Sequence, residues 1–133
     1  MVIKDVLVCV TRQISCERLI KEGARLVNEN EKLHVVNVSP DGKKFLGEQH
    51  QGGSRTAEAL EYLFEISKNY GAYMTVVRSE NVAKALAGFL NQNKIALVIL
   101  GASNDEKSIQ TLVHNIKRDV KHPLEIRILP IEE

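Results

Sequence analysis

The sequence predicts a single α/β domain over residues 1–133, with one open parallel sheet of five strands and helices on both faces. Predicted strands and helices alternate along the whole chain, which is typical of a parallel sheet with right-handed helical crossovers. Two segments, residues 6–10 and 95–100, are continuously apolar, as expected of central strands that are buried on both faces. If these two strands are neighbours, the strand order is 3-2-1-4-5.

In the first third of the chain we expect a strand over residues 2–10, a loop over 11–14 and a helix that Ser15 caps, with Glu17 in its first turn. The second strand spans residues 33–38, and the turn-forming residues 39–42 follow it. The apolar positions of this first helix are spaced to face the sheet: Leu19, Ile20, Gly23, Ala24 and Val27.

The apolar residues of 43–53 show neither helical nor strand periodicity, so we expect a loop there. This loop is either a lid or a connection without a role in binding. The second helix begins near Ser54, and Gly71 is well placed just after its end. A third strand follows over residues 72–77, and Ser79 or Asn81 caps the third helix. The expected inner faces are Ala57, Leu60, Leu63, Phe64 and Ser67 in the second helix, and Val82, Leu86, Phe89 and Leu90 in the third.

The fourth strand, residues 95–100, ends at Gly101, which permits a tight turn. Ser103 and Glu106 then form the S-x-x-E pattern of a capping box, so a fourth helix begins there. Its inner face is Ile109, Leu112, Val113, Ile116 and Val120. Residues 123–130 alternate apolar with charged side chains between two prolines, which predicts an edge strand.

The composition excludes several classes of partner. With 18 basic and 17 acidic residues the net charge is +1, so we expect no nucleic acid and no anionic membrane as partners. The apolar runs are too short to span a membrane and the first ten residues do not resemble a signal peptide, which favours a cytoplasmic location. Two cysteines and four scattered histidines have no metal-ligand spacing, so we expect no metal site.

In this fold, ligands bind at the carboxyl ends of the strands where the strand order reverses, here between the first and fourth strands. Residues 11–13 and 101–103 line that crevice. Neither GxxxxGK[ST] nor GxGxxG occurs, and no histidine is expected beside Cys16 to form a nucleophile–base pair. We therefore name no catalytic residue.

Several segments resemble the universal stress protein (UspA-like) family: VLVCVTRQISCERLIKEGARL, then EISKNYGAYMTVVRSENVAKALAGFLNQNKIALVILGAS, and finally PLEIRILP. They are most similar to the universal-stress-like domain of Kdp potassium-transport sensor kinases, which has S-x-x-S-E-R-L-I, E-D-V-A and V-I-L-G segments. The resemblance covers nearly all of the chain outside residues 40–54. It implies a Rossmann-like fold of the adenine nucleotide α-hydrolase type.

Members of the ATP-binding branch of that family resemble one another in carrying G-x2-G-x9-G-[ST] from the fourth strand into the fourth helix, and an aspartate at the end of the first strand. Here Gly101 matches the first glycine, but Asn104, His114 and Asn115 stand at the later positions and Thr11 at the aspartate. The resemblance thus implies weak or absent ATP binding, although ATP or another adenine nucleotide is the ligand class it points to. The S-x-S that senses cyclic di-AMP in some Kdp-type domains is altered too.

The expected ligand-binding positions are Thr11, Gln13, Ser15, Val38, Gly101, Ser103, Lys107 and Asn115. Thr11 could equally close a turn and Ser15 cap a helix. The leading hypothesis is a non-catalytic regulatory or stress-response module that acts through self-association or a protein partner, with a nucleotide-like ligand. The alternative is an ATP-binding protein with weak ATPase activity. The predicted homodimer pairs the last strand of two copies through Leu124, Ile126 and Ile128.

Overall fold

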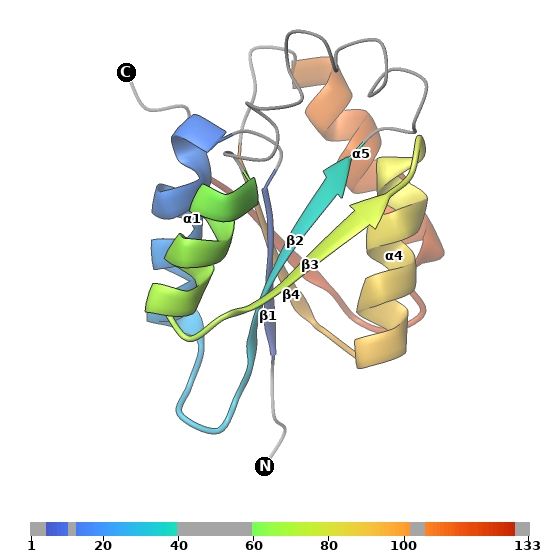
Figure 1. The fold of residues 1–133 in the computed structure, drawn as a ribbon. Helices are drawn as coiled ribbons and strands as arrows, with labels where there is room; N and C mark the ends of the chain where they lie inside the picture. The colour runs from blue at the N-terminus through green and yellow to red at the C-terminus, as the bar shows by residue number, and fades with distance from the viewer. Residues whose placement is uncertain (1–4, 11–12, 40–59, 102–105, 130–133) are drawn as a thin grey trace, which may run out of the picture.

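The computed structural model describes residues 5–10, 13–39, 60–101 and 106–129. These form one five-stranded sheet in the order β3-β2-β1-β4-β5, in which every neighbouring pair is parallel (Figure 1). The predicted fold class and strand order are confirmed. The strands are β1 Val6–Cys9, β2 Leu33–Ser39, β3 Tyr73–Arg78, β4 Leu97–Gly101 and β5 Glu125–Leu129.

The helices cover both faces of this sheet. They are α1 Gln13–Leu26, α4 Val82–Asn93 and α5 Glu106–Asp119, and the described part of a further helix spans residues 60–69 (helix 60–69). Helix α1 and helix 60–69 lie on one face, and α4 and α5 lie on the other (Figure 1). None of the helical segments in the described ranges is long and apolar enough to cross a membrane.

The hydrophobic core has two halves because side chains of a strand alternate between the faces of the sheet. In β1, Val6 and Val8 pack in the cluster that includes Ile20 of α1. Leu7 and Cys9 pack in the opposite cluster, with Leu86 and Leu90 of α4 and Ile116 of α5. All of these residues are buried, which explains why the first strand reads as continuously apolar.

The start of α1 differs from the expectation. The helix begins at Gln13, so residues 13 and 14 are helical rather than loop, and Ser15 lies inside the first turn. The prediction that Ser15 is the N-cap is therefore wrong. A helix-compatible glutamine and isoleucine precede the serine, and nothing in their side chains opposes an earlier start.

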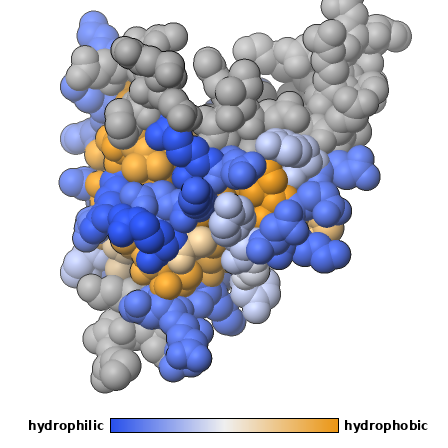
Figure 2. Space-filling model, turned by 90° about the vertical axis from the view of Figure 1, so that its left-hand side faces the viewer, coloured by the Kyte–Doolittle hydropathy of each residue, from blue (hydrophilic) through white to orange (hydrophobic). Residues whose placement is uncertain are grey.

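The inner face of helix 60–69 also differs. Phe64 was expected to face the sheet, but its side chain is 53% exposed, and Ile66 is only 6% exposed. Leu63, Ile66 and Ser67 share the buried face, at the three- and four-residue spacing of a helix. The side of the molecule that carries α1 and this helix accordingly shows apolar patches among hydrophilic side chains (Figure 2).

Two predicted helix ends are confirmed. Asn81, not Ser79, is the N-cap of α4, since its Oδ1 accepts a hydrogen bond from the Lys84 amide at 3.0 Å. Gly71 has a φ of 68°, the left-handed conformation expected just after a helix. The predicted loop over 43–53, the helix start near Ser54, Ala57 and the Ser103 side of the capping box lie outside the described residues.

Candidate functional site

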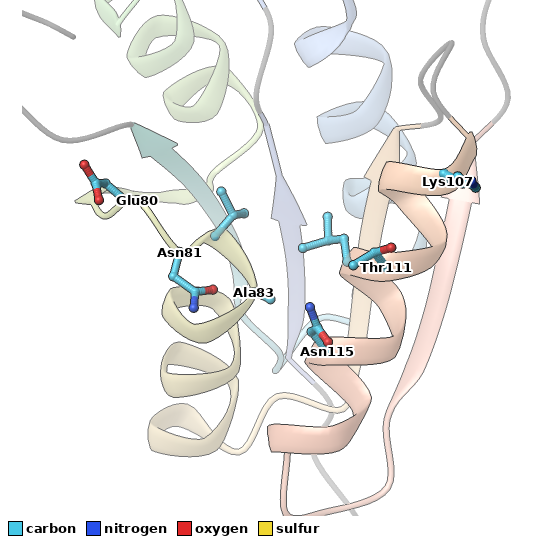
Figure 3. A pocket seen from close by; sticks show the side chains of 8 residues that line it. Glu80, Asn81, Ala83, Lys107, Thr111 and Asn115 are labelled. Carbon is cyan, nitrogen blue, oxygen red and sulfur yellow. The ribbon is translucent and has the colours of Figure 1, made fainter.

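A pocket of about 500 Å³ opens between α4 and α5, next to the carboxyl ends of the strands (Figure 3). Glu80 and Asn81 reach it from the turn that follows β3, and Lys107 from the first turn of α5. The edge of an open α/β sheet where the strands end is the usual place for a ligand. The lining residues are Glu80, Asn81, Val82, Ala83, Lys107, Thr111, Leu112 and Asn115.

One face of α5 supplies the polar wall of this pocket. Lys107, Thr111 and Asn115 follow each other at intervals of four residues, so their side chains lie one above the other along the helix. They provide an ammonium group, a hydroxyl and an amide, which together can donate to an anion and exchange hydrogen bonds with a sugar or a base. Leu112 lies beside them and packs against the core cluster under α4 and α5.

The amino end of α4 forms the opposite wall, and its own hydrogen bonds fix its shape. Asn81 accepts from the Lys84 amide, and the Oγ of Ser79 accepts from the Asn81 amide at 3.1 Å. At least one free amide of the helix start is thus already satisfied internally. Among the described lining residues, the cation of the pocket is Lys107.

The two charged groups of the pocket lie at its opposite ends, Glu80 beside α4 and Lys107 at the top of α5 (Figure 3). In this view both charged groups point outward from the space between the helices, so a ligand would reach them at the two ends of the pocket and not in its middle. The lining between them is neutral, partly polar and partly apolar. Such a lining suits a molecule with an anionic group at one end and hydroxyl or amino groups at the other.

The structure brings two of the predicted ligand residues together, Lys107 and Asn115. Val38 is buried in the cluster against which Val82 and Leu112 pack, so it supports the pocket from below. Gly101 ends β4, and a Cβ placed there would lie 3.3 Å from Cδ1 of Leu19. Its visible role is close packing against α1, and its role in ligand binding stays a prediction.

The remaining predicted positions cannot be placed in the pocket. Thr11 and Ser103 lie outside the described residues, and Gln13 and Ser15 belong to the first turn of α1, with side chains outside the described set. The sequence analysis missed Glu80, Asn81 and Thr111. The four-residue spacing of 107, 111 and 115 could have identified Thr111. Glu80 and Asn81 could have been identified because they follow β3, whose carboxyl end lies on the same side of the sheet as that of β4.

Cys9 and His34 lie away from this pocket and have structural surroundings. Burial raises the pKa of the Cys9 thiol to about 12, so it stays protonated and unreactive at neutral pH. His34 contacts Asp5, with 3.2 Å between Nε2 and Oδ2, near the amino end of β2. Among the described residues, no three His, Cys, Asp or Glu side chains gather where they could hold a metal ion.

No protein-family model and no curated protein matches this sequence. Solved structures do match over almost its whole length. The hypothetical protein MJ0577 superposes with a TM-score of 0.68 at 14% identity, over 100% of this chain and 99% of that one. A universal stress protein from Archaeoglobus fulgidus, in complex with dAMP, gives 0.61 at 16% identity, over 99% and 100%.

This chain has the universal stress protein fold. A member of the universal stress protein family from Arabidopsis thaliana with AMP bound superposes with a TM-score of 0.57 at 8% identity, over 94% of this chain and 91% of that one. At such low identities the universal stress protein fold is what the likeness establishes. The finer resemblance to the Kdp sensor kinase domain stays a prediction from the sequence.

Proposed function

We propose that this protein is a non-catalytic regulatory module of the universal stress protein family, and that it binds a nucleoside monophosphate in the pocket between α4 and α5. The observation that carries the proposal is the charge of that pocket: one cation, Lys107, and one carboxylate, Glu80, at opposite ends. Two solved structures with this fold hold dAMP and AMP, which supports the ligand class.

The charge balance favours a monophosphate over a triphosphate. A phosphate monoester carries about −1.5 to −2 charges at pH 7, which one lysine and the positive end of α5 can largely offset. Further phosphate groups would find no second cation among the lining residues that the structure describes.

The positions of the two charges also suggest an orientation. The phosphate group lies toward Lys107 and Thr111, which supply charged and neutral donors. The ribose hydroxyls then point toward Glu80, because a carboxylate is a strong acceptor for them and would repel a phosphate. Asn115 remains for the base or the sugar, since its amide offers both a donor and an acceptor. Asn81 can add its Nδ2 as a donor, because its Oδ1 already accepts from the Lys84 amide.

A regulatory role in the cytoplasm is proposed in preference to catalysis. Among the described residues that line the pocket there is one carboxylate and no cysteine or histidine, so they offer neither a carboxylate pair nor an obvious nucleophile and base. Slow hydrolysis of ATP, the alternative reading of the sequence, would need a polyphosphate site, which these described residues do not form. The nucleotide would then act as a signal that changes how the protein associates.

A thermal-shift panel with AMP, ADP, ATP and cyclic di-AMP, with and without magnesium, tests the ligand class. A ligand at one hundred times its Kd adds about 2.7 kcal/mol to the unfolding free energy, which raises Tm by several degrees. We expect the largest shift with AMP. A larger shift with Mg-ATP than with AMP would contradict the proposal and favour the alternative.

Matched lysine variants then test the location. Lys107→Gln removes the cation of the pocket and should weaken AMP binding about 10- to 100-fold, the cost of a hydrogen bond to a charged group. Lys117→Gln makes the same change ten residues along the same helix, outside the pocket, and should bind AMP normally. Equal affinities of the two variants would show that AMP binds elsewhere.

We also propose that the protein self-associates through the free edge of β5. The Glu125 amide donates to the Ala96 carbonyl at 2.8 Å, so it faces β4. Backbone groups alternate sides along a strand, and those of Ile126 and Ile128 therefore point away from the sheet, where a second copy can pair with them. Ile128 is 42% exposed and, with Leu124 and Ile126, would add apolar contacts.

Proline substitutions distinguish backbone groups at the free edge of β5 from those that pair with β4. Ile128→Pro removes one outward N–H and should convert a dimer into a folded monomer, seen as a halved mass in light scattering. Arg127→Pro is the matched control, since by the same alternation it removes an N–H that faces β4 and should destabilise the fold itself. An unchanged dimer in folded Ile128→Pro would exclude this edge as the interface.

A further inference from the structure

A second, larger cavity of about 900 Å³ lies at the opposite ends of the strands, where β4 and β5 begin. Its walls come from the end of α1, the end of α4 with the residues before β4, and the segment between α5 and β5. The apolar part of the lining is Leu26, Ala96, Leu97, Pro123 and Leu124. The volume is within the range of small-molecule sites.

Hydrogen bonds fix the walls of this cavity. The Asn91 side chain donates to the Asp119 carbonyl at 3.0 Å and accepts from the Lys121 amide at 2.9 Å, which ties α4 to the end of α5. His122 donates through Nε2 to the Ile95 carbonyl at 2.6 Å. The cavity is thus largely formed before a ligand arrives, which lowers the entropic cost of binding.

The rim of the cavity is positively charged. Lys94, Lys121 and Arg127 line it together with one carboxylate, Glu125, which pairs with Arg127 at 2.7 Å. These four side chains give +2, and the carboxyl ends of α4 and α5 contribute about −0.5 each, which leaves about +1. Lys94 and Lys121 are both exposed, and no ion pair joins either of them to another described residue.

We propose that this cavity binds a small amphipathic carboxylate, a molecule with one anionic head group and an apolar body. The head group lies between Lys94 and Lys121, and the apolar body covers Leu97 and Leu124. A net charge of about +1 matches a single carboxylate and gives little support for a polyanion. The site uses residues that the nucleotide pocket does not share, so the two proposals stand or fall separately.

Titration with decanoate, followed by amide chemical shifts in ¹⁵N-labelled protein, tests the proposal. We expect saturable shifts at residues 94–97 and 121–125. Decyltrimethylammonium has the same tail with the opposite charge, and butyrate has the same head with a short tail. Both should bind at least tenfold more weakly, because each lacks one of the two features that the cavity recognises.

Paired lysine variants provide the control. Lys94→Gln combined with Lys121→Gln should weaken decanoate binding about tenfold. Lys84→Gln combined with Lys117→Gln removes two exposed lysines of α4 and α5, the helices that Lys94 and Lys121 follow, and should leave decanoate binding unchanged because both lie outside the cavity. Equal affinity for decanoate and decyltrimethylammonium, equal loss in both double variants, or the absence of saturable shifts would overturn the proposal.

Discussion

Gly23 sets how closely α1 approaches the sheet, and replacing it with alanine should destabilise the protein. A Cβ at this position would lie 2.6 Å from Cγ2 of Val8 and 2.8 Å from Cδ1 of Leu33. Both side chains are buried, and valine has little rotational freedom about χ1, so neither can move away easily. The backbone of α1 would have to shift away from β1 and β2.

Two opposing terms determine the size of the effect. Overpacking a core typically costs about 1–3 kcal/mol, whereas alanine in a helix interior is about 0.8–1 kcal/mol better than glycine. Gly88 in α4 offers a matched control, because a Cβ placed there meets nothing within 4 Å. Gly88→Ala should therefore stabilise the protein, and the difference between the two variants should be about 1–3 kcal/mol, which is the overpacking cost alone.

Urea denaturation of the two variants measures this difference directly. With a slope of about 1–3 kcal/mol per molar urea, their midpoints should be separated by roughly 0.5–2 M, with Gly88→Ala above the wild type and Gly23→Ala below Gly88→Ala. If both variants were stabilised equally, the close contact between α1 and the sheet would be refuted.

Three further predictions concern the buried thiol of Cys9 and the side chain of Asn91. In a Cys16→Ser background, Cys9 should not react with Ellman's reagent at pH 8 unless urea is added. Its pKa of about 12 leaves only ~10⁻⁴ of the thiol ionised at that pH. A reaction in the native state would contradict the burial of Cys9. Because this pKa is raised above the ordinary value of 9.0, unfolding releases a proton between pH 9 and 12, and the unfolding free energy should fall as the pH rises through that range, more than in a Cys9→Ala variant. Asn91→Ala should cost about 1–2 kcal/mol in urea unfolding, because it removes a part-buried hydrogen bond to the Asp119 carbonyl and an exposed one from the Lys121 amide. Asn93→Ala loses one exposed bond to the Phe89 carbonyl and should change stability little. Equal losses would show that Asn91 does not bridge the helices.

The sequence was sufficient for the topology because burial on both faces leaves a direct signal. The continuous apolar runs at residues 6–10 and 95–100 predicted central strands, and the sheet places β1 and β4 side by side. Periodicity was less reliable where several apolar residues compete for one face. Phe64 and Ile66 are both apolar, and packing against β1 and β2 decided which one is buried.

The pocket was predictable only in part, because it combines elements that are distant in the sequence. Lys107 and Asn115 were found through their place after the fourth strand. Glu80 and Asn81 enter from the end of β3, which is not a neighbour of β4, and reach the pocket because α4 packs against α5. Local capping rules identified Asn81 as an N-cap candidate but gave no information about what lies opposite its side chain.

The most direct test of the proposed function is to map AMP binding by amide chemical shifts in ¹⁵N-labelled protein. We predict saturable shifts at residues 80–83 and 107–115, which line the pocket from α4 and α5, and their loss in Lys107→Gln. Residues 121–127, which lie near the beginning of β5 at the opposite ends of the strands, should show no shifts. Saturable shifts confined to another surface, or no shifts at millimolar AMP, would contradict the proposal that this pocket is a nucleoside monophosphate site.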